Sequence, residues 1–180
     1  MVRTTDLEKN NFITNVRYIT KLAYNFLKKS KIFGGEIIIN KIGSAGKVYL
    51  MPQLHRPVSL GMNAFLLRFN NKVNNIFVYY LLTSRYGQGI IQKVVRGAVT
   101  KTITKKAVRE LKIPLPPIEV QKKFASITNR MTSIFEIQTK STQKIDSLFN
   151  SLLSKAFNGE LLKEKPLDNY VTKLKQASLK

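Results

Sequence analysis

The chain has 180 residues, of which 43% are hydrophobic and 9% aromatic, enough for a packed core and against general disorder. It carries 31 Lys and Arg residues against 10 Asp and Glu residues, so its formal net charge is +21. A charge this large favours a polyanionic partner, and nucleic acid is preferred to an anionic membrane surface. The alternative is a basic surface that serves no partner.

Several classes of protein are excluded by what the chain lacks. Without cysteine there is no disulfide framework, thiolate metal site or cysteine nucleophile. Residues 1–12 are charged and do not resemble a secretory signal, and no apolar run approaches the ~20 residues of a membrane span. We therefore expect a cytoplasmic protein.

The first third of the chain alternates helical and extended patterns. Residues 3–18 are polar and predict a loop with a short strand. Thr20 suits the N-cap of a helix over 21–29. Apolar runs at 36–40, 48–51 and 64–69 predict three strands. The residues expected to face the core in the first helix are Leu22, Ala23, Phe26 and Leu27.

The second third predicts mostly helices. Residues 76–84 favour a helix, YGQG at 86–89 a turn, and 90–95 a second helix. Residues 96–103 predict a loop leading into a short strand, after which Thr104 can cap a helix that ends at Leu111. The fold class is therefore α+β, a globular domain with a small mixed sheet and short helices.

One long helix should follow, because residues 118–157 contain neither Pro nor Gly. About 40 residues at ~1.5 Å each give a length of about 60 Å. Gln138 and Ser141 interrupt an apolar heptad seam that requires a partner helix. The seam residues, predicted to mediate dimerisation, are Val120, Phe124, Ile127, Met131, Ile134, Ile145, Leu148 and Leu152.

The loop at 41–47, KIGSAGK, invites comparison with a nucleotide-binding phosphate loop. The loop does not match that motif, because Lys41 occupies the position of its first Gly and Val48 the position of its Ser or Thr. Two readings stay open. The loop is either a glycine turn between two strands or a backbone that approaches phosphate through Gly43 and Gly46.

The chain shows no pattern expected of a catalyst. His55 is the only histidine, and no pair of carboxylates has the spacing of a metal site or an acid/base dyad. We therefore predict no catalytic, cofactor-binding or metal-binding residue. The aromatic residues Phe65, Phe77, Tyr79 and Tyr80 are expected to fill the core.

Charge distribution favours nucleic-acid binding, since no acidic residue lies between Glu36 and Glu110 whereas basic residues recur throughout. Basic and hydroxyl side chains can donate hydrogen bonds to phosphates, and Arg or Lys to guanine edges. The candidate DNA-binding residues are Lys41, Ser44, Lys47, Arg68, Arg96, Thr100, Lys101, Thr102 and Lys105.

Four motifs, in order, resemble the specificity (S) subunit of type I restriction-modification systems. Residues 35–39 followed by 43–47 are similar to the family's GDILI…GS.GK. Residues 97–103 resemble the late part of a target recognition domain. Residues 113–123, IPLPPIEVQKK, resemble the lead into the family's spacer helix, and 151–161 resemble its end.

This resemblance implies a target recognition domain at 1–111, a proline-led spacer and dimerisation helix at 112–161 and a basic tail at 162–180. The domain would read a half-site in double-stranded DNA and is expected to be short at its start. Methyltransferase (M) subunits, and possibly restriction (R) subunits, would dock on the helices. They would bind the S-adenosylmethionine, ATP and Mg²⁺, whereas this chain would bind no cofactor.

With one domain and one helix, the chain is expected to form a homodimer or to pair with another half-subunit, reading a palindromic two-part site when symmetric. Two other classes stay open. One is a non-catalytic basic scaffold that binds RNA or DNA and dimerises through its helix. The other is a stand-alone nuclease or methyltransferase, for which we expect no turnover.

Overall fold

The computed structural model describes residues 1–162, so the predicted basic tail lies almost entirely outside the described residues. The chain divides into two compact units, Met1–Ile127 and Thr128–Lys180. Each unit is described by itself. No helix among the described residues has the length and apolar character needed to cross a membrane.

The first unit is built around strand β2 (Ile37–Asn40), which pairs with β3 (Val48–Leu50) and β5 (Ala64–Leu67). A second sheet joins β1 (Lys31–Ile32) to β4 (Val58–Ser59). The three predicted strands and the α+β class are confirmed. The pairing within both sheets is antiparallel rather than mixed.

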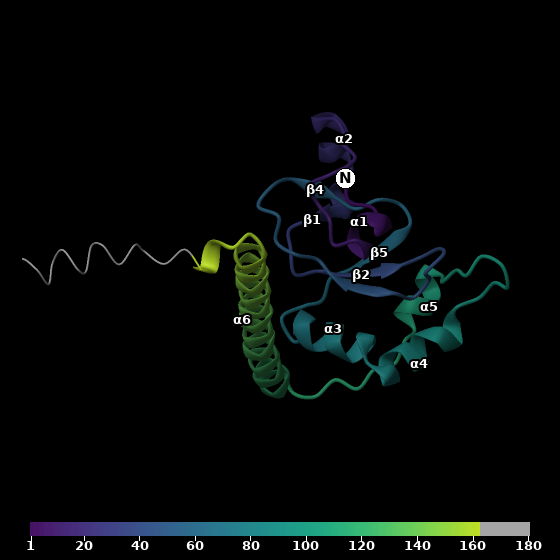
Figure 1. Ribbon diagram of the computed structural model, residues 1–180. Helices are drawn as coiled ribbons and strands as arrows, with labels where there is room; N and C mark the ends of the chain where they lie inside the picture. Colours follow the sequence, from purple (N-terminus) through teal and green to yellow (C-terminus); the bar gives the residue numbers. More distant parts are fainter. Residues whose placement is uncertain (163–180) are drawn as a thin grey trace, which may run out of the picture. The chain divides into compact units, whose positions relative to one another are not determined.

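The central sheet has a core on each face. Neighbouring side chains of a strand point to opposite faces. Ile38 therefore enters the first core, whereas Ile37 and Ile39 enter the second core, and all three are 0% exposed. Figure 1 shows α1 (Thr4–Glu8) on one side of β2 and α3 (Asn75–Thr83) on the other. Burial on both faces explains why β2 is a continuous apolar run.

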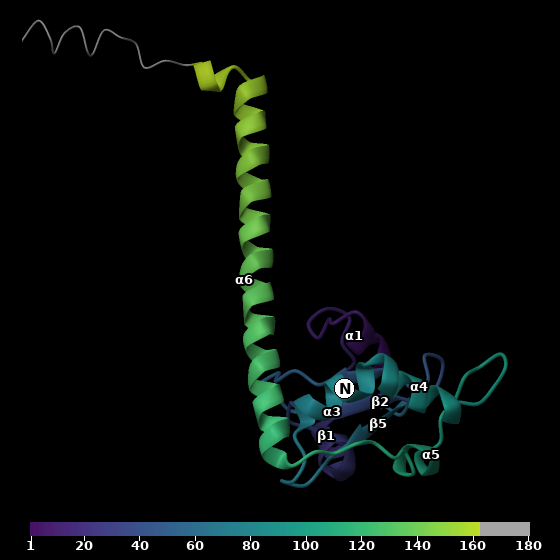
Figure 2. The same cartoon turned by 90° about the horizontal axis from the view of Figure 1, so that it is seen from below.

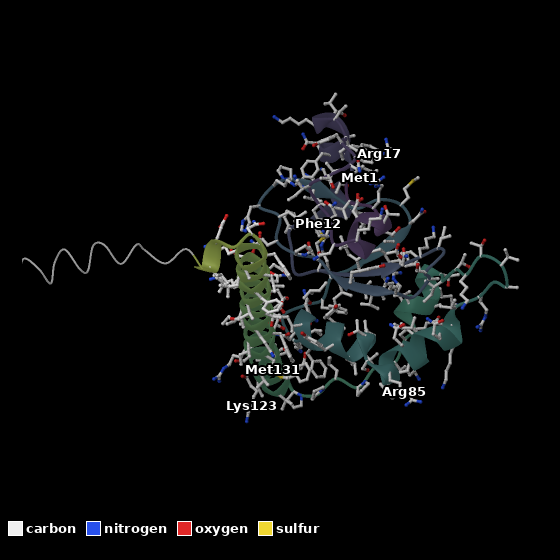
Figure 3. All side chains as sticks on the ribbon, viewed as in Figure 1. Met1, Phe12, Arg17, Arg85, Lys123 and Met131 are labelled. Atoms are coloured by element: carbon white, nitrogen blue, oxygen red, sulfur yellow. The ribbon has the colours of Figure 1, made fainter. Side chains whose placement is uncertain are left out.

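Helix α1 replaces the loop predicted for the N-terminal segment. Its start is stabilised by Asp6, whose carboxylate accepts a hydrogen bond from the Arg3 backbone N–H at 2.8 Å and pairs with the Arg3 guanidinium at 2.6 Å. Leu7 and Phe12 are buried in the first core. Phe12, labelled in Figure 3, also accepts a hydrogen bond from Arg56 through its carbonyl oxygen.

Helix α2 (Lys21–Phe26) begins as predicted, because the Thr20 hydroxyl accepts a hydrogen bond from the Ala23 N–H at 3.2 Å. It is shorter than expected and is followed by a 3₁₀ turn, η1 (Lys28–Ser30). The predicted buried face is wrong: Leu22 is 83% and Phe26 85% exposed. No residue of α2 is buried, so its apolar pattern has no core to face within the first unit.

The YGQG segment is helical, not a turn, and belongs to α4 (Arg85–Val94). Ser84 caps α4 by accepting a hydrogen bond from the Gly87 N–H at 3.1 Å. A Cβ atom at Gly87 would lie 2.1 Å from the Leu81 carbonyl oxygen. The glycine therefore permits the close corner between α3 and α4, a packing requirement that local turn propensity does not reveal.

Helix α5 (Lys105–Arg109) is capped as predicted by Thr104, which accepts from the Ala107 N–H at 3.1 Å, and ends before the expected Leu111. Helix α6 (Ile118–Phe157) has 40 residues, which confirms the predicted long helix. The short strand expected before α5 is reduced to isolated bridges at Thr102.

Gln121 fastens the first turn of α6 to the start of α3. Its side chain is 1% exposed. Its amide oxygen accepts from the Asn74 N–H at 2.8 Å, and its amide nitrogen donates to the carbonyls of Pro116 at 2.7 Å and Lys72 at 3.3 Å. Both halves of the amide are therefore used, a requirement that neither Glu nor Leu can meet.

Replacing Gln121 with Ala is expected to destabilise the first unit by about 1–3 kcal/mol, because the partly buried Asn74 N–H loses its acceptor. Gln121→Glu should cost more, since a buried carboxylate would face the carbonyls of Pro116 and Lys72. Thermal unfolding followed by circular dichroism measures both. A matched exposed variant, Lys123→Ala, should leave the Tm unchanged, and equal Tm values for all three would contradict the anchoring role.

Candidate nucleic-acid interface

Two loops predicted to contact phosphates are hydrogen-bonded to each other. The Ile103 N–H donates to the Lys41 carbonyl at 3.0 Å, and the Gly43 N–H donates to the Lys101 carbonyl at 2.9 Å. Figures 1 and 2 show the β2–β3 loop and the α4–α5 loop at the same edge of the first unit. We call residues 41–47 the first loop and residues 96–105 the second loop, and the two together the basic loop pair.

The second loop is closed on itself before it meets the first. Arg96 and Thr102 exchange backbone hydrogen bonds of 2.9 and 2.7 Å. Gly97 has a φ of +101°, and a Cβ atom there would lie 2.2 Å from the Thr100 carbonyl oxygen. Residues 97–101 are therefore held as a tight loop on a defined base.

The basic loop pair brings together eight of the nine candidate DNA-binding residues. Lys47, Lys101 and Lys105 are exposed, so their ammonium groups can reach a ligand in solvent. Lys47 lies over the Tyr49 ring at 5.6 Å, and Lys41 over the Phe65 ring at 6.0 Å. The remaining members of the eight are Ser44, Arg96, Thr100 and Thr102.

The glycine N–H groups of the first loop are used internally. Gly43 donates to Lys101, and Gly46 donates to the Asn40 carbonyl at 2.9 Å. A Cβ atom at Gly46 would lie 2.5 Å from Cγ2 of Ile91, so this glycine permits close packing on α4. These contacts favour the glycine-turn reading, because neither glycine N–H remains to donate to a phosphate.

Arg68, the ninth candidate, lies at the other end of β2. It follows β5, whose Leu67 is opposite Ile37, whereas Lys41 follows Asn40. Its guanidinium donates to the carbonyls of Lys29 and Lys31 and lies 4.0 Å from the Glu36 carboxylate. Through these contacts Arg68 stabilises the segment around Lys29 and Lys31, and it lies outside the basic loop pair.

A carboxylate that the sequence did not single out lies beside the first loop. The Ser44 hydroxyl donates to Oε1 of Glu8 at 2.8 Å, and the Tyr49 hydroxyl donates to the same oxygen at 3.3 Å. Burial, and then the charge of Glu8, raises the pKa of the Tyr49 hydroxyl, so Tyr49 stays a protonated donor at neutral pH. Residues 8 and 44 are too distant in sequence for periodicity to connect them.

Three of the four aromatic residues expected in the core pack against it, and Tyr80 instead meets a ring of α6. Phe65, Phe77 and Tyr79 pack against the second core. The Phe124 ring of α6 meets the rings of Phe77 at 5.5 Å and Tyr80 at 5.8 Å, both edge to face. Phe124 thereby holds the start of α6 on the first unit, a role different from the predicted seam contact.

The part of α6 in the second unit presents a broad apolar surface. Its predicted seam residues from Met131 onward are all at least half exposed, and Met131 is labelled in Figure 3. A second line beside the seam, absent from the sequence prediction, consists of Phe135, Phe149 and Leu153. Apolar surface of this extent is typical of a helix that buries one face against another chain.

The described residues contain no group of three His, Cys, Asp or Glu side chains arranged to hold a metal ion. His55 is exposed in a turn with a φ of +51°. The basic loop pair offers ammonium, guanidinium and hydroxyl donors, which suit binding to a polyanion.

Comparison with known proteins identifies the family of the chain. A family model described as the type I restriction modification DNA specificity domain matches residues 2–147. The chain belongs to this family. The membership confirms the resemblance seen in the sequence.

Relatives of the specificity domain family are longer than this chain. It is 27% identical over 158 residues to the MjaX specificity subunit of Methanocaldococcus jannaschii, covering 85% of this chain and 37% of that protein. It is 22% identical over 169 residues to the EcoBI specificity subunit of Escherichia coli, covering 89% of this chain and 35% of that protein. The chain thus spans little more than a third of either relative's length.

A solved structure shows the same fold. The S subunit of a type I restriction-modification system from M. genitalium aligns with a TM-score of 0.54 at 21% identity. The alignment covers 83% of this chain and 38% of that one. The specificity domain described here therefore shares the arrangement of antiparallel sheets and short helices followed by a long helix.

Proposed function

We propose that the first unit reads a half-site in duplex DNA and that α6 pairs two such units. The observation that carries this proposal is the basic loop pair. Hydrogen bonds join two segments more than fifty residues apart, and both lie in a stretch of chain without a single acid between Glu36 and Glu110.

Phosphate contacts supply affinity and position, whereas base contacts supply specificity. Lysines on exposed loops suit the first task, since they are long, flexible point charges. Arg96 and Thr100 lie on the same loop pair and can donate to phosphates or base edges. Because the loops are fixed to each other, their donors approach DNA in one arrangement instead of independently.

Pairing is supported by the exposed seam of α6. A single helix in water gains nothing from an apolar stripe, so we propose that a second copy, or a different half-subunit, covers it. Gln138 and Ser141 lie at the polar centre of the seam, where an antiparallel pair of helices would cross. An isologous pair would read a palindromic site in two parts.

The second apolar line, Phe135, Phe149 and Leu153, supports a further contact surface on the same helix. We assign it to docking of methyltransferase subunits, and of restriction subunits where the system has them. In this proposal those cytoplasmic partners bind S-adenosylmethionine, ATP and Mg²⁺, and the chain itself contributes recognition and spacing.

Binding to a random duplex DNA pool and to a structured RNA pool in moderate salt tests the proposal. We expect the chain to retain duplex DNA in preference to RNA, and light scattering to report a dimer. Equal or stronger retention of RNA would favour a general basic scaffold instead. A monomer that binds DNA would overturn the pairing and leave the recognition unit in place.

A further inference from the structure

Glu8 differs from the other carboxylates of the first unit. Four of them have a cation within 4.0 Å: Asp6, Glu36, Glu110 and Glu119. Glu8 is the fifth, it is exposed, and none of the ion pairs within residues 1–162 involves it. Its charge is therefore not neutralised by a neighbour.

Hydroxyl groups hold this carboxylate instead. Ser44 and Tyr49 both donate to Oε1, at 2.8 and 3.3 Å. Neither donor reaches Oε2, so that oxygen keeps its capacity to accept. Two donors from different segments, a loop and a strand, orient the side chain at the rim of the basic loop pair.

The fold does not require a charge at this position. Helix α1 already starts on the Arg3–Asp6 contact, and Leu7 supplies its core contact. In contrast, an exposed carboxylate hydrogen-bonded to Ser44 of the basic loop pair opposes the approach of phosphate, since like charges repel. A carboxylate beside a surface proposed to face DNA is suited to a partner that donates hydrogen bonds.

Duplex DNA offers such donors at base edges. In the major groove the amino groups of cytosine (N4) and adenine (N6) donate, whereas guanine and thymine present carbonyl acceptors, and Glu is a natural acceptor for cytosine N4. We propose that Glu8 is a specificity-determining residue whose carboxylate accepts a hydrogen bond from a base amino group, with Ser44 and Tyr49 as its positioning residues. The inference rests on the proposed reading of duplex DNA.

The test compares base preferences of the full chain and three variants by sequencing the duplexes that each retains. Glu8→Ala should lose about tenfold discrimination at one base pair of the half-site while keeping binding to unrelated duplex. Glu8→Gln keeps a side-chain oxygen that accepts from Ser44 and Tyr49. It should shift the preferred base at that position toward adenine, because an amide both donates and accepts. Ser44→Ala/Tyr49→Phe should weaken the same preference partially.

The outcomes separate this inference from the proposed function. A wild-type chain that retains duplexes without any base preference would overturn both. A wild-type motif that stays unchanged in Glu8→Ala and Glu8→Gln would overturn the role of Glu8 alone and make it a structural link between α1 and the first loop. Since Glu8→Gln is nearly isosteric, it keeps the test decisive if Glu8→Ala fails to fold.

Discussion

Replacing Leu148 with Asp is expected to convert the paired chain into a monomer. Leu148 is 64% exposed in the single chain and lies in the predicted seam of α6. An isologous pair contains this position twice, so the loss of two buried leucines amounts to roughly 3–6 kcal/mol before the cost of burying two charges. The Kd of the pair should therefore rise at least a hundredfold, which light scattering across a dilution series would detect.

Ser147→Asp provides the matched control, because it adds the same charge at a neighbouring exposed position outside the seam. It should leave the pair intact. Both variants should keep the helical signal of the wild type, since Asp has similar effects on helix propensity at adjacent sites. If light scattering still reports a dimer for Leu148→Asp, the interface does not lie on the predicted seam.

Replacing Lys47 and Lys101 together with Ala should reduce DNA affinity roughly a hundredfold at low salt. Both side chains are exposed on the basic loop pair, where the hydrogen bond from the Gly43 N–H to the Lys101 carbonyl helps to hold the two loops in contact. Each lost phosphate contact lowers the slope of log K against log salt by ~0.9, so the double variant should lose ~1.8. Fluorescence titrations of a short duplex from 50 to 200 mM salt measure the slope.

Lys122→Ala/Lys123→Ala removes the same charge from the first turns of α6, which Figures 1 and 2 place away from the basic loop pair. This control should keep most of the slope, because only nearby charges release counterions from the bound phosphates. Similar losses for both double variants would mean that net charge, rather than the loop pair, drives binding.

Local patterns were sufficient to predict the main elements. The apolar run of β2, the caps at Thr20 and Thr104 and the uninterrupted stretch of α6 each depend on residues close in sequence. Capping and periodicity act over a few residues, so the chain displays them directly. The stretch without acidic residues between Glu36 and Glu110 can also be read directly from the sequence.

The contacts that build the site could not be predicted in this way. Gly43 meets Lys101, and Glu8 meets Ser44, through pairings set by tertiary packing. The apolar face of α2 was predicted to be buried because periodicity indicates that a face is apolar but not what covers it. Local turn propensity places Gly87 in a turn, whereas in the structure this glycine lies in α4 and permits close packing against the end of α3.

The reason for a glutamine at position 121 is visible only in the structure. It lies in the segment IPLPPIEVQKK that carries the family resemblance, but the sequence does not show which groups its side chain contacts. Three hydrogen bonds to backbone groups of Asn74, Pro116 and Lys72 explain why an amide is needed. A buried polar residue within a helix start is thus a marker of docking rather than of solvent exposure.

Sequencing the duplexes that the full chain retains from a random pool tests most directly whether two recognition units are spaced by paired helices. We predict a motif in two parts separated by a gap of constant length, with the two parts related by inversion when the pair is symmetric. In Leu148→Asp, only one part should remain. A single continuous motif in the wild type, or two parts at variable spacing, would contradict this arrangement.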